Sequence, residues 1–114
     1  MNTEKDPRVF LNHITESIEA IERYAKGQTL ETFLTSLKEQ DAMVRRIEII
    51  GEAVKNLPKN FKIKHPKIPW KKIAGMRDIL IHEYFLVDLR AVWDTSKDDL
   101  PILKKQIKDL LKRL

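Results

Sequence analysis

Arg77, His82 and Tyr84 place three complementary functional groups within one eight-residue stretch of the chain. Histidine exchanges a proton near neutral pH, so it can act as a general base. Arginine carries a permanently charged, planar fork that matches the oxygen atoms of a phosphate. Metal-free cleavage of RNA needs a base for the 2′-hydroxyl proton and a cation for the charge gained by the adjacent phosphate. These residue types therefore indicate phosphodiester chemistry.

The spacing of these residues limits how one helix can present them. At about 100° per residue, Arg77 and Tyr84 lie roughly 20° apart and share a face, whereas Arg77 and His82 lie about 140° apart. Either the helix distorts near His82, or two copies of the helix meet and each contributes a residue. The second alternative predicts a site built across a symmetric dimer.

Each histidine and the tyrosine also have a common structural interpretation. His82 is consistent with a hydrogen-bonded structural residue, and Tyr84 with ordinary packing. His13, in the first expected helix, is assigned a structural role, and His65 is expected to be a solvated loop residue. The chain has no cysteine and no HExxH motif, so no thiol nucleophile and no metal site are expected.

Positive charge is concentrated in one window of the chain. The whole sequence has 22 basic and 17 acidic residues, a net charge of +5, but the window from Ala53 to Arg77 holds eight basic residues and no acidic one. Such a stripe is expected to bind a phosphate-rich partner, although a solvated lysine-rich loop has the same composition. The candidate RNA-binding residues in it are Lys62, Lys64, Lys67, Lys71 and Lys72.

The hydrophobic residues have a helical period, and no stretch alternates for long enough to predict a strand. Residues 1–114 have the length of a single domain. Asp6 and Pro7 predict the start of a first helix and Gly27 its end. Its inner face is expected at Leu11, Ile14, Ile18, Ile21 and Ala25. Thr29 is expected to cap a short helix with an inner face of Phe33, Leu34 and Leu37.

A second long helix is expected before Pro58, with Met43, Ile47, Ile50, Val54 and Leu57 on its inner face. Gly51, in its interior, indicates either close approach of another backbone or simple tolerance of a glycine. Residues 58–69 contain three prolines and are expected to form a loop. A third long helix is expected from Pro69 to about Tyr84, with an inner face of Ile73, Met76 and Leu80.

The C-terminal part predicts one or two more helices. Asp88 is expected to cap a segment whose apolar residues are Leu89, Val92 and Trp93. Asp98 or Asp99, followed by Pro101, either caps the last helix or marks a kink within one long helix. The last helix is expected to use Ile102, Gln106 and Leu110. The predicted fold is therefore an all-α antiparallel bundle of four to five helices.

The motif Arg77-x4-His82-x-Tyr84 resembles the signature of HepT toxins, which belong to the HEPN superfamily of small all-helical nucleases. The polar residue after the arginine, Asp78, also fits the HEPN pattern. The resemblance continues through RRIEIIGEAVKNLP (45–58), IPWKKIAGMRDILIHEYFLVD (68–88) and LRAVWDTSKDDLPILKKQI (89–107), in order and spacing.

The resemblance implies a HEPN-like homodimer that acts as the toxin of a toxin–antitoxin pair. The implied activity is metal-independent endoribonuclease, with Arg77 and His82 of both subunits in a cleft and no cofactor of its own. The implied partner is an MntA-like minimal nucleotidyltransferase antitoxin, which transfers AMP from ATP to Tyr84. The added phosphate beside Arg77 would occlude the cleft. Asp78 is a candidate to orient Arg77 or His82.

Two further expectations concern neighbouring residues and other functional classes. Glu48 and Glu52 are candidates to face the site from the neighbouring helix. A non-catalytic helical dimer, which binds nucleotide or RNA and serves as the AMP acceptor of a nucleotidyltransferase, would show the same basic stripe. No stretch approaches the length of a membrane span, and the start has no apolar signal region, so a cytoplasmic protein is expected.

Overall fold

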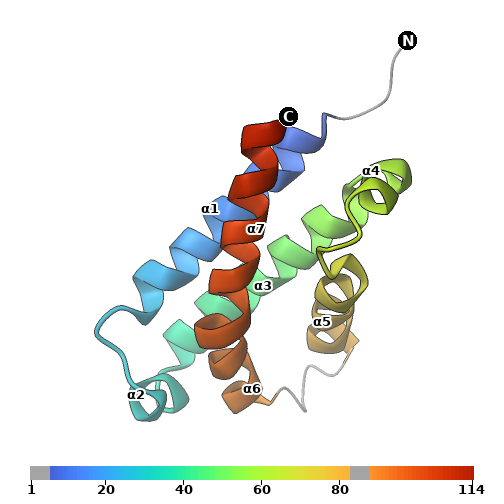
Figure 1. Ribbon diagram of the computed structural model, residues 1–114. Helices are drawn as coiled ribbons and strands as arrows, with labels where there is room; N and C mark the ends of the chain where they lie inside the picture. The colour runs from blue at the N-terminus through green and yellow to red at the C-terminus, as the bar shows by residue number, and fades with distance from the viewer. Residues whose placement is uncertain (1–5, 83–87) are drawn as a thin grey trace.

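The structure is a computed structural model that describes residues 6–82 and 88–114, with side chains for residues 6–77 and 88–114. These residues form helices and connections, with no strand among them, which confirms the predicted all-α class (Figure 1). The elements are α1 (Pro7–Ala25), α2 (Leu30–Leu34), α3 (Leu37–Asn56), α4 (Lys59–Lys64), α5 (Trp70–His82), α6 (Leu89–Asp94), the π-helical segment η2 (Thr95–Asp99) and α7 (Leu100–Arg113).

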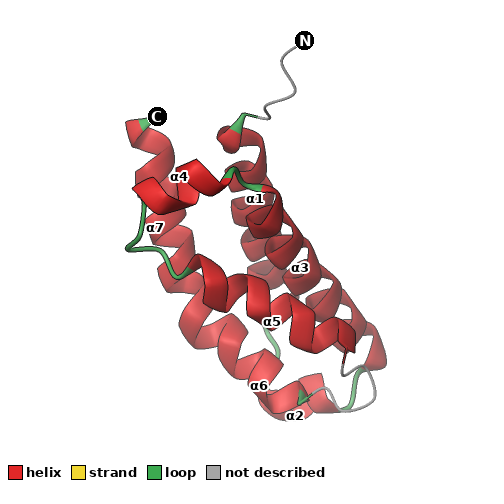
Figure 2. Cartoon of the chain, turned by 90° about the vertical axis from the view of Figure 1, so that its right-hand side faces the viewer, coloured by secondary structure: helices red, strands yellow, loops and turns green. Residues whose placement is uncertain are grey.

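The long helices run alternately up and down (Figures 1 and 2). Helix α1 packs along α3 and α7, and α5 packs on the other side of α3. The short helices α2 and α6 meet at one end, while α4 lies at the opposite end. The core between α1, α3 and α7 includes Leu11, Ile14, Ile18, Ile21, Met43, Ile47, Ile50, Val54, Ile107 and Leu110, all at most 1% exposed.

The predicted helix boundaries at Asp6, Gly27, Thr29 and Asp88 are confirmed. The Asp6 carboxylate accepts a hydrogen bond from the Arg8 backbone N–H at 3.0 Å, and the Asp88 carboxylate accepts one from the Ala91 N–H at 3.1 Å. Thr29 caps α2 through a reciprocal pair of hydrogen bonds with Thr32. Gly27 has a φ of 79°, a backbone conformation that glycine adopts without steric cost, and it ends α1.

The prediction that residues 58–69 form a loop is wrong in part, because Lys59–Lys64 is the short helix α4. The three prolines flank this helix instead of interrupting it. Pro58 lies at its N-cap position, where its carbonyl accepts a hydrogen bond from the Lys62 N–H at 3.2 Å and its missing N–H costs nothing. Within 59–64 there is neither proline nor glycine to prevent a helical turn.

Two predicted inner faces are corrected by the structure. Phe33 is fully buried, but Leu34 and Leu37 are 43% and 71% exposed, because α2 has only five residues and Leu37 already begins α3 behind its own cap, Ser36. Ile102 is 63% exposed, and Leu103 faces the core in its place. The buried face of α7 consists of Leu100, Leu103, Ile107 and Leu110, at steps of three and four residues, so it lies one position beyond Ile102 and Gln106.

The two alternatives for the Asp98–Pro101 region are settled in favour of one continuous helix. Segment η2 joins α6 to α7 without a break, and neither the Asp94 nor the Asp99 side chain makes a capping hydrogen bond. Pro101 lies in the first turn of α7, where its missing N–H is tolerated. Ser96, buried in the π-helical turn, donates a hydrogen bond to the Trp93 carbonyl at 2.7 Å.

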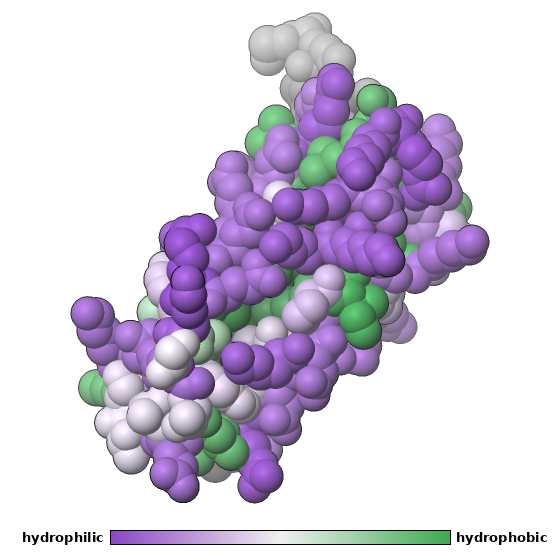
Figure 3. All heavy atoms as spheres, turned by 60° about the vertical axis from the view of Figure 1, so that its left-hand side comes forward, coloured by the Kyte–Doolittle hydropathy of each residue, from purple (hydrophilic) through white to green (hydrophobic). Residues whose placement is uncertain are grey.

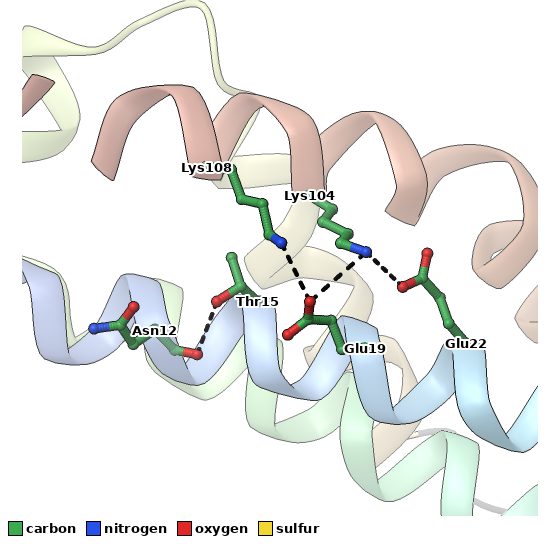
Figure 4. A network of polar contacts seen from close by, with 6 residues as sticks. All are labelled: Asn12, Thr15, Glu19, Glu22, Lys104 and Lys108. Carbon is green, nitrogen blue, oxygen red and sulfur yellow. Dashed lines mark hydrogen bonds and ion pairs between the residues drawn. The ribbon is translucent and has the colours of Figure 1, made fainter. Parts of the chain in front are cut away.

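Ion pairs connect α1 with α7 (Figure 4). The Lys104 Nζ is 2.8 Å from a Glu22 oxygen and 3.8 Å from a Glu19 oxygen, and the Lys108 Nζ is 3.2 Å from Glu19. The hydrogen bond from Lys108 lowers the pKa of Glu19, and the hydrogen bond to Glu22 raises the pKa of Lys104. These contacts tie the C-terminal helix to the N-terminal one, so they stabilise the closed bundle.

The surface is predominantly polar on the face seen in Figure 3, where hydrophilic side chains cover most of the area and hydrophobic atoms show only in separate small areas. Among the described residues, no helix has both the length and the apolar character that crossing a membrane requires.

Candidate active site on helix α5

Arg77 lies where α5 crosses α3, directly over Gly51. A Cβ atom built on Gly51 would overlap the Cβ atom of Arg77 and would lie 2.7 Å from its Cγ and 3.3 Å from its Cα. Only a residue without a side chain allows α5 to approach α3 this closely. Of the two alternatives for Gly51, close approach of another backbone is therefore the correct one.

The guanidinium of Arg77 is held by the residue next to Gly51. Its Nη2 atom is 3.0 Å from the Glu52 Oε2 atom, in a hydrogen-bonded ion pair. The Arg77 side chain is only 21% exposed, whereas the Glu52 side chain is 59% exposed. Glu52 thus faces Arg77 from the neighbouring helix. Glu48, one turn earlier on α3, forms an ion pair with Arg45 at 3.7 Å instead.

A polar hollow of about 320 Å³ lies between α1 and α3, with Glu52 in its wall. His13 also lines this hollow. The sequence analysis assigned His13 a structural role, but the residue is exposed and lies outside the core. The His13 ring lies edge-on to the Phe10 ring, with the ring centroids 6.4 Å apart. The remaining walls are Arg45, Glu48, Ile49, Ala53 and Asn56.

The other predicted motif residues follow Arg77 along the chain. The backbone of α5 is α-helical through Asp78 and up to His82, so it shows no distortion before His82 that would bring Arg77 and His82 into phase. The side chains of Asp78 and His82, and the whole of Tyr84, lie outside the described residues. Their predicted roles therefore stay predictions.

The candidate RNA-binding lysines divide into two groups. Lys64, Lys67, Lys71 and Lys72 are exposed. Lys62 is half-buried, and its Nζ donates a hydrogen bond to the Val54 carbonyl at 3.1 Å, so it ties α4 to the end of α3. Among the described residues, Lys62 thus has a structural hydrogen bond of this kind, and the other four candidate lysines do not.

Two hollows lie beside these lysines, both against α7. Lys67 and Lys72 line one of about 310 Å³, together with apolar residues of α5 and α7. Lys64 and Lys67 line another of about 380 Å³, to which α7 adds Arg113. The sequence analysis missed Arg113 because 46 residues separate it from Lys67, and no local pattern connects them.

His65 lies in the wall of the second hollow and is half-buried, not fully solvated as expected. Its ring lies 4.7 Å from the Phe61 ring, and its carbonyl accepts a hydrogen bond from the Trp70 Nε1 at 2.9 Å. His65 therefore helps to hold α4 against the start of α5. Within the residues that the structure describes, no group of three histidine, aspartate or glutamate side chains is placed to hold a metal ion.

Comparison with known proteins decides the family. Residues 14–110 match the family described as "Ribonuclease HepT-like". The chain belongs to this family of ribonucleases. The HepT-like resemblance of the motif is thereby confirmed, and the helical bundle is consistent with a HEPN-like fold.

Individual relatives agree with the family over nearly the whole chain. The chain is 50% identical over 109 residues to "Putative RNase TTE0752" of Caldanaerobacter subterraneus subsp. tengcongensis, covering 96% of this chain and 97% of the relative. It is 50% identical over 103 residues to "Probable ribonuclease HepT" of Thermococcus cleftensis, covering 90% and 94%.

A third relative is a longer protein. The chain is 54% identical over 110 residues to "Gamma-glutamylcyclotransferase and putative RNase MJ0434" of Methanocaldococcus jannaschii. The alignment covers 96% of this chain but only 50% of that relative, so the chain spans half the length of that protein. No solved structure matches the chain.

Proposed function

We propose that this HepT-like chain is the toxin of a toxin–antitoxin pair and cleaves RNA internally without a metal ion. The observation that carries the proposal is the fixed position of Arg77. Gly51 lets α5 rest on α3, and Glu52 holds the guanidinium, on the same helix that continues to His82. A half-buried arginine in this setting, in a family of ribonucleases, is a candidate to bind the phosphate that reacts.

The proposed reaction uses His82 as the general base. His82 takes the proton from a ribose 2′-hydroxyl, the oxygen attacks the adjacent phosphorus, and the bond to the 5′-oxygen of the next nucleotide breaks. The products are a 2′,3′-cyclic phosphate and a 5′-hydroxyl, to which a proton is returned. Arg77 stabilises the negative charge that builds up on the phosphate oxygens during the attack.

A homodimer supplies the geometry that one chain lacks. On a regular helix, residues five apart point about 140° away from each other, and α5 is regular up to His82. We infer that α5 helices of two copies meet, so that Arg77 of one chain and His82 of the other serve one phosphate. The exposed residues Lys64, Lys67, Lys71 and Lys72 are proposed to bind the flanking phosphates.

The proposed partner is an MntA-like nucleotidyltransferase antitoxin. It would transfer AMP from ATP to the Tyr84 hydroxyl, with pyrophosphate as the leaving group. By sequence spacing, Tyr84 and Arg77 share a helix face, since seven residues turn an ideal helix to within about 20° of two full turns. The added AMP phosphate would compete with RNA for Arg77 and so neutralise the toxin.

Cleavage of single-stranded RNA in EDTA by the purified chain tests the catalytic proposal. Wild type is expected to cut, and both Arg77→Ala and His82→Ala are expected to cut at least about 100-fold more slowly. Arg45→Ala, an exposed arginine of α3, is the control and should retain activity. Equal rates for wild type and His82→Ala would reject His82 as the general base. No cutting by wild type would reject catalysis and leave the non-catalytic RNA-binding dimer.

The modification is tested separately by mass spectrometry after co-expression with the nucleotidyltransferase. The chain should gain the mass of at least one AMP group, and Tyr84→Phe should gain none. If Tyr84→Phe gains the same mass, the AMP acceptor is another residue.

A further inference from the structure

We propose that Glu52 is a positioning residue that sets the Arg77 guanidinium in place before RNA binds. This inference rests on the proposed ribonuclease function and adds to the site a residue outside the motif. The Glu52 carboxylate is expected to change the rate of the reaction by holding Arg77, without touching the RNA itself.

The Arg77 side chain is held at both ends by adjacent residues of α3. Its Cβ and Cγ atoms lie against Gly51, and its Nη2 atom lies 3.0 Å from the Glu52 carboxylate. An unrestrained arginine side chain samples many rotamers, and this freedom is lost when the guanidinium is fixed on a phosphate. Fixing most of that freedom in the RNA-free protein removes a cost that would otherwise be met during the reaction.

The exposure of the pair separates this role from one in stability. The Glu52 side chain is 59% exposed, and an ion pair with a solvent-exposed partner contributes little to folding. Replacing Glu52 by glutamine should therefore leave the fold intact. A change in the catalytic rate of that variant reports on the position of Arg77.

The negative charge of Glu52 should also affect how tightly the protein binds RNA. A carboxylate 3.0 Å from the arginine also repels an approaching RNA phosphate, so it weakens binding while it orders the cation. Glu52→Gln is therefore expected to lower kcat by about tenfold. The same variant is expected to lower KM by about two- to threefold, since the repulsion is gone. A residue that only supports the fold would not lower kcat and KM together.

Glu48→Gln is the matched control. Glu48 lies one turn earlier on α3, lines the same hollow and is paired with Arg45, not with Arg77. The Glu48→Gln variant loses one negative charge close to Glu52 but leaves the contact with Arg77 in place. Its kcat is therefore expected to stay within twofold of wild type. In an Arg77→Lys background, Glu52→Gln is expected to cause no further loss of kcat, because its effect passes through the guanidinium.

The experiment measures kcat and KM of RNA cleavage for wild type, Glu52→Gln and Glu48→Gln, each also with Arg77→Lys. NMR order parameters of the Arg77 side chain in the RNA-free protein are measured in parallel and should fall in Glu52→Gln only. If wild type cleaves RNA and Arg77→Ala does not, but Glu52→Gln matches Glu48→Gln in kcat and in Arg77 order, the inference on Glu52 fails alone. If wild type cleaves no RNA, the proposed function and this inference fail together.

Discussion

Arg77 packs through its Cβ atom onto the backbone of α3 at Gly51, so the residue proposed to stabilise the reacting phosphate is also the contact between two helices. The distance between α3 and α5 at this point is set by the absence of a side chain on Gly51. The position of Arg77 and the stability of the helix packing therefore depend on the same contact. A change at Gly51 should affect both, although Gly51 has no side chain that could take part in the reaction.

Gly51→Ala tests this coupling. A Cβ atom at Gly51 would meet Arg77 atoms at distances no packed structure tolerates, so α5 must shift. In a helix interior alanine is favoured over glycine by about 1 kcal/mol. Overpacking costs more, about 1–3 kcal/mol net in the free energy of unfolding, measured by urea denaturation. Cleavage activity is expected to fall as well, because Arg77 moves with α5.

Gly75→Ala is the control for this prediction. Gly75 is also in a helix, on α5, but a Cβ atom there would have no described atom within 4 Å apart from its own stretch of helix backbone. Only the preference of the helix for alanine over glycine remains, so the free energy of unfolding of this variant is expected to rise by about 1 kcal/mol. Equal effects of the two substitutions would contradict the close approach of α5 to α3.

The ion pairs between α1 and α7 predict a dependence of stability on pH. The hydrogen bond from Lys108 holds the pKa of Glu19 below its usual value of 4.5, so this carboxylate stabilises the fold above that pH. The contribution is lost as the pH falls through the lowered pKa. Glu19→Gln is therefore expected to lower Tm by about 1–2 °C at pH 7 and by nothing once the pH is well below the lowered pKa of Glu19.

The measurement is thermal unfolding of both proteins followed by circular dichroism at several pH values. Glu16→Gln changes another exposed carboxylate of α1 and should leave Tm unchanged at every pH. A Tm difference for Glu19→Gln that persists undiminished in strong acid would show that its charge is not the cause.

Much of the fold follows from local signals in the sequence. Apolar residues three and four apart on α1 and α3 correctly predicted the core face, for example Ile14, Ile18, Ile47 and Ile50. Capping residues such as Asp6 and Thr29 correctly predicted helix starts, because their side chains bond to the first backbone N–H groups. These features depend only on residues within one or two turns.

The errors concern which face of a helix is buried and which residues lie near each other in the fold. The inward prediction for Leu37 failed because α2 ends after five residues and Leu37 begins α3. That for Ile102 failed although the buried residues of α7, Leu100, Leu103, Ile107 and Leu110, follow one another at steps of three and four residues. The pairing of Glu52 with Arg77 joins residues 25 apart, so the sequence made Glu52 a candidate without giving its partner. The proximity of Arg113 to Lys67 likewise depends on the tertiary fold.

The two groups of lysines predict different outcomes on substitution. Lys71→Ala and Lys72→Ala remove exposed cations, so each is expected to reduce the slope of log affinity for single-stranded RNA against log salt by about 0.7. Lys62→Ala removes a hydrogen bond to the Val54 carbonyl, so it is expected to cost about 1 kcal/mol of stability. RNA-binding titrations at several salt concentrations and urea denaturation separate the two effects. A larger salt effect for Lys62 than for Lys71 and Lys72 would contradict the assignment.

Complementation between two inactive variants tests the shared dimer site most directly. Arg77→Ala and His82→Ala chains carrying different affinity tags are co-expressed, and mixed dimers are isolated through both tags in turn. In a mixed dimer one site combines an intact Arg77 with an intact His82 from opposite chains, and the other site has neither. Mixed dimers should therefore cleave RNA at about half the wild-type rate per dimer. Mixed dimers as inactive as either variant alone, or a failure of the two chains to associate, would contradict a site shared between subunits.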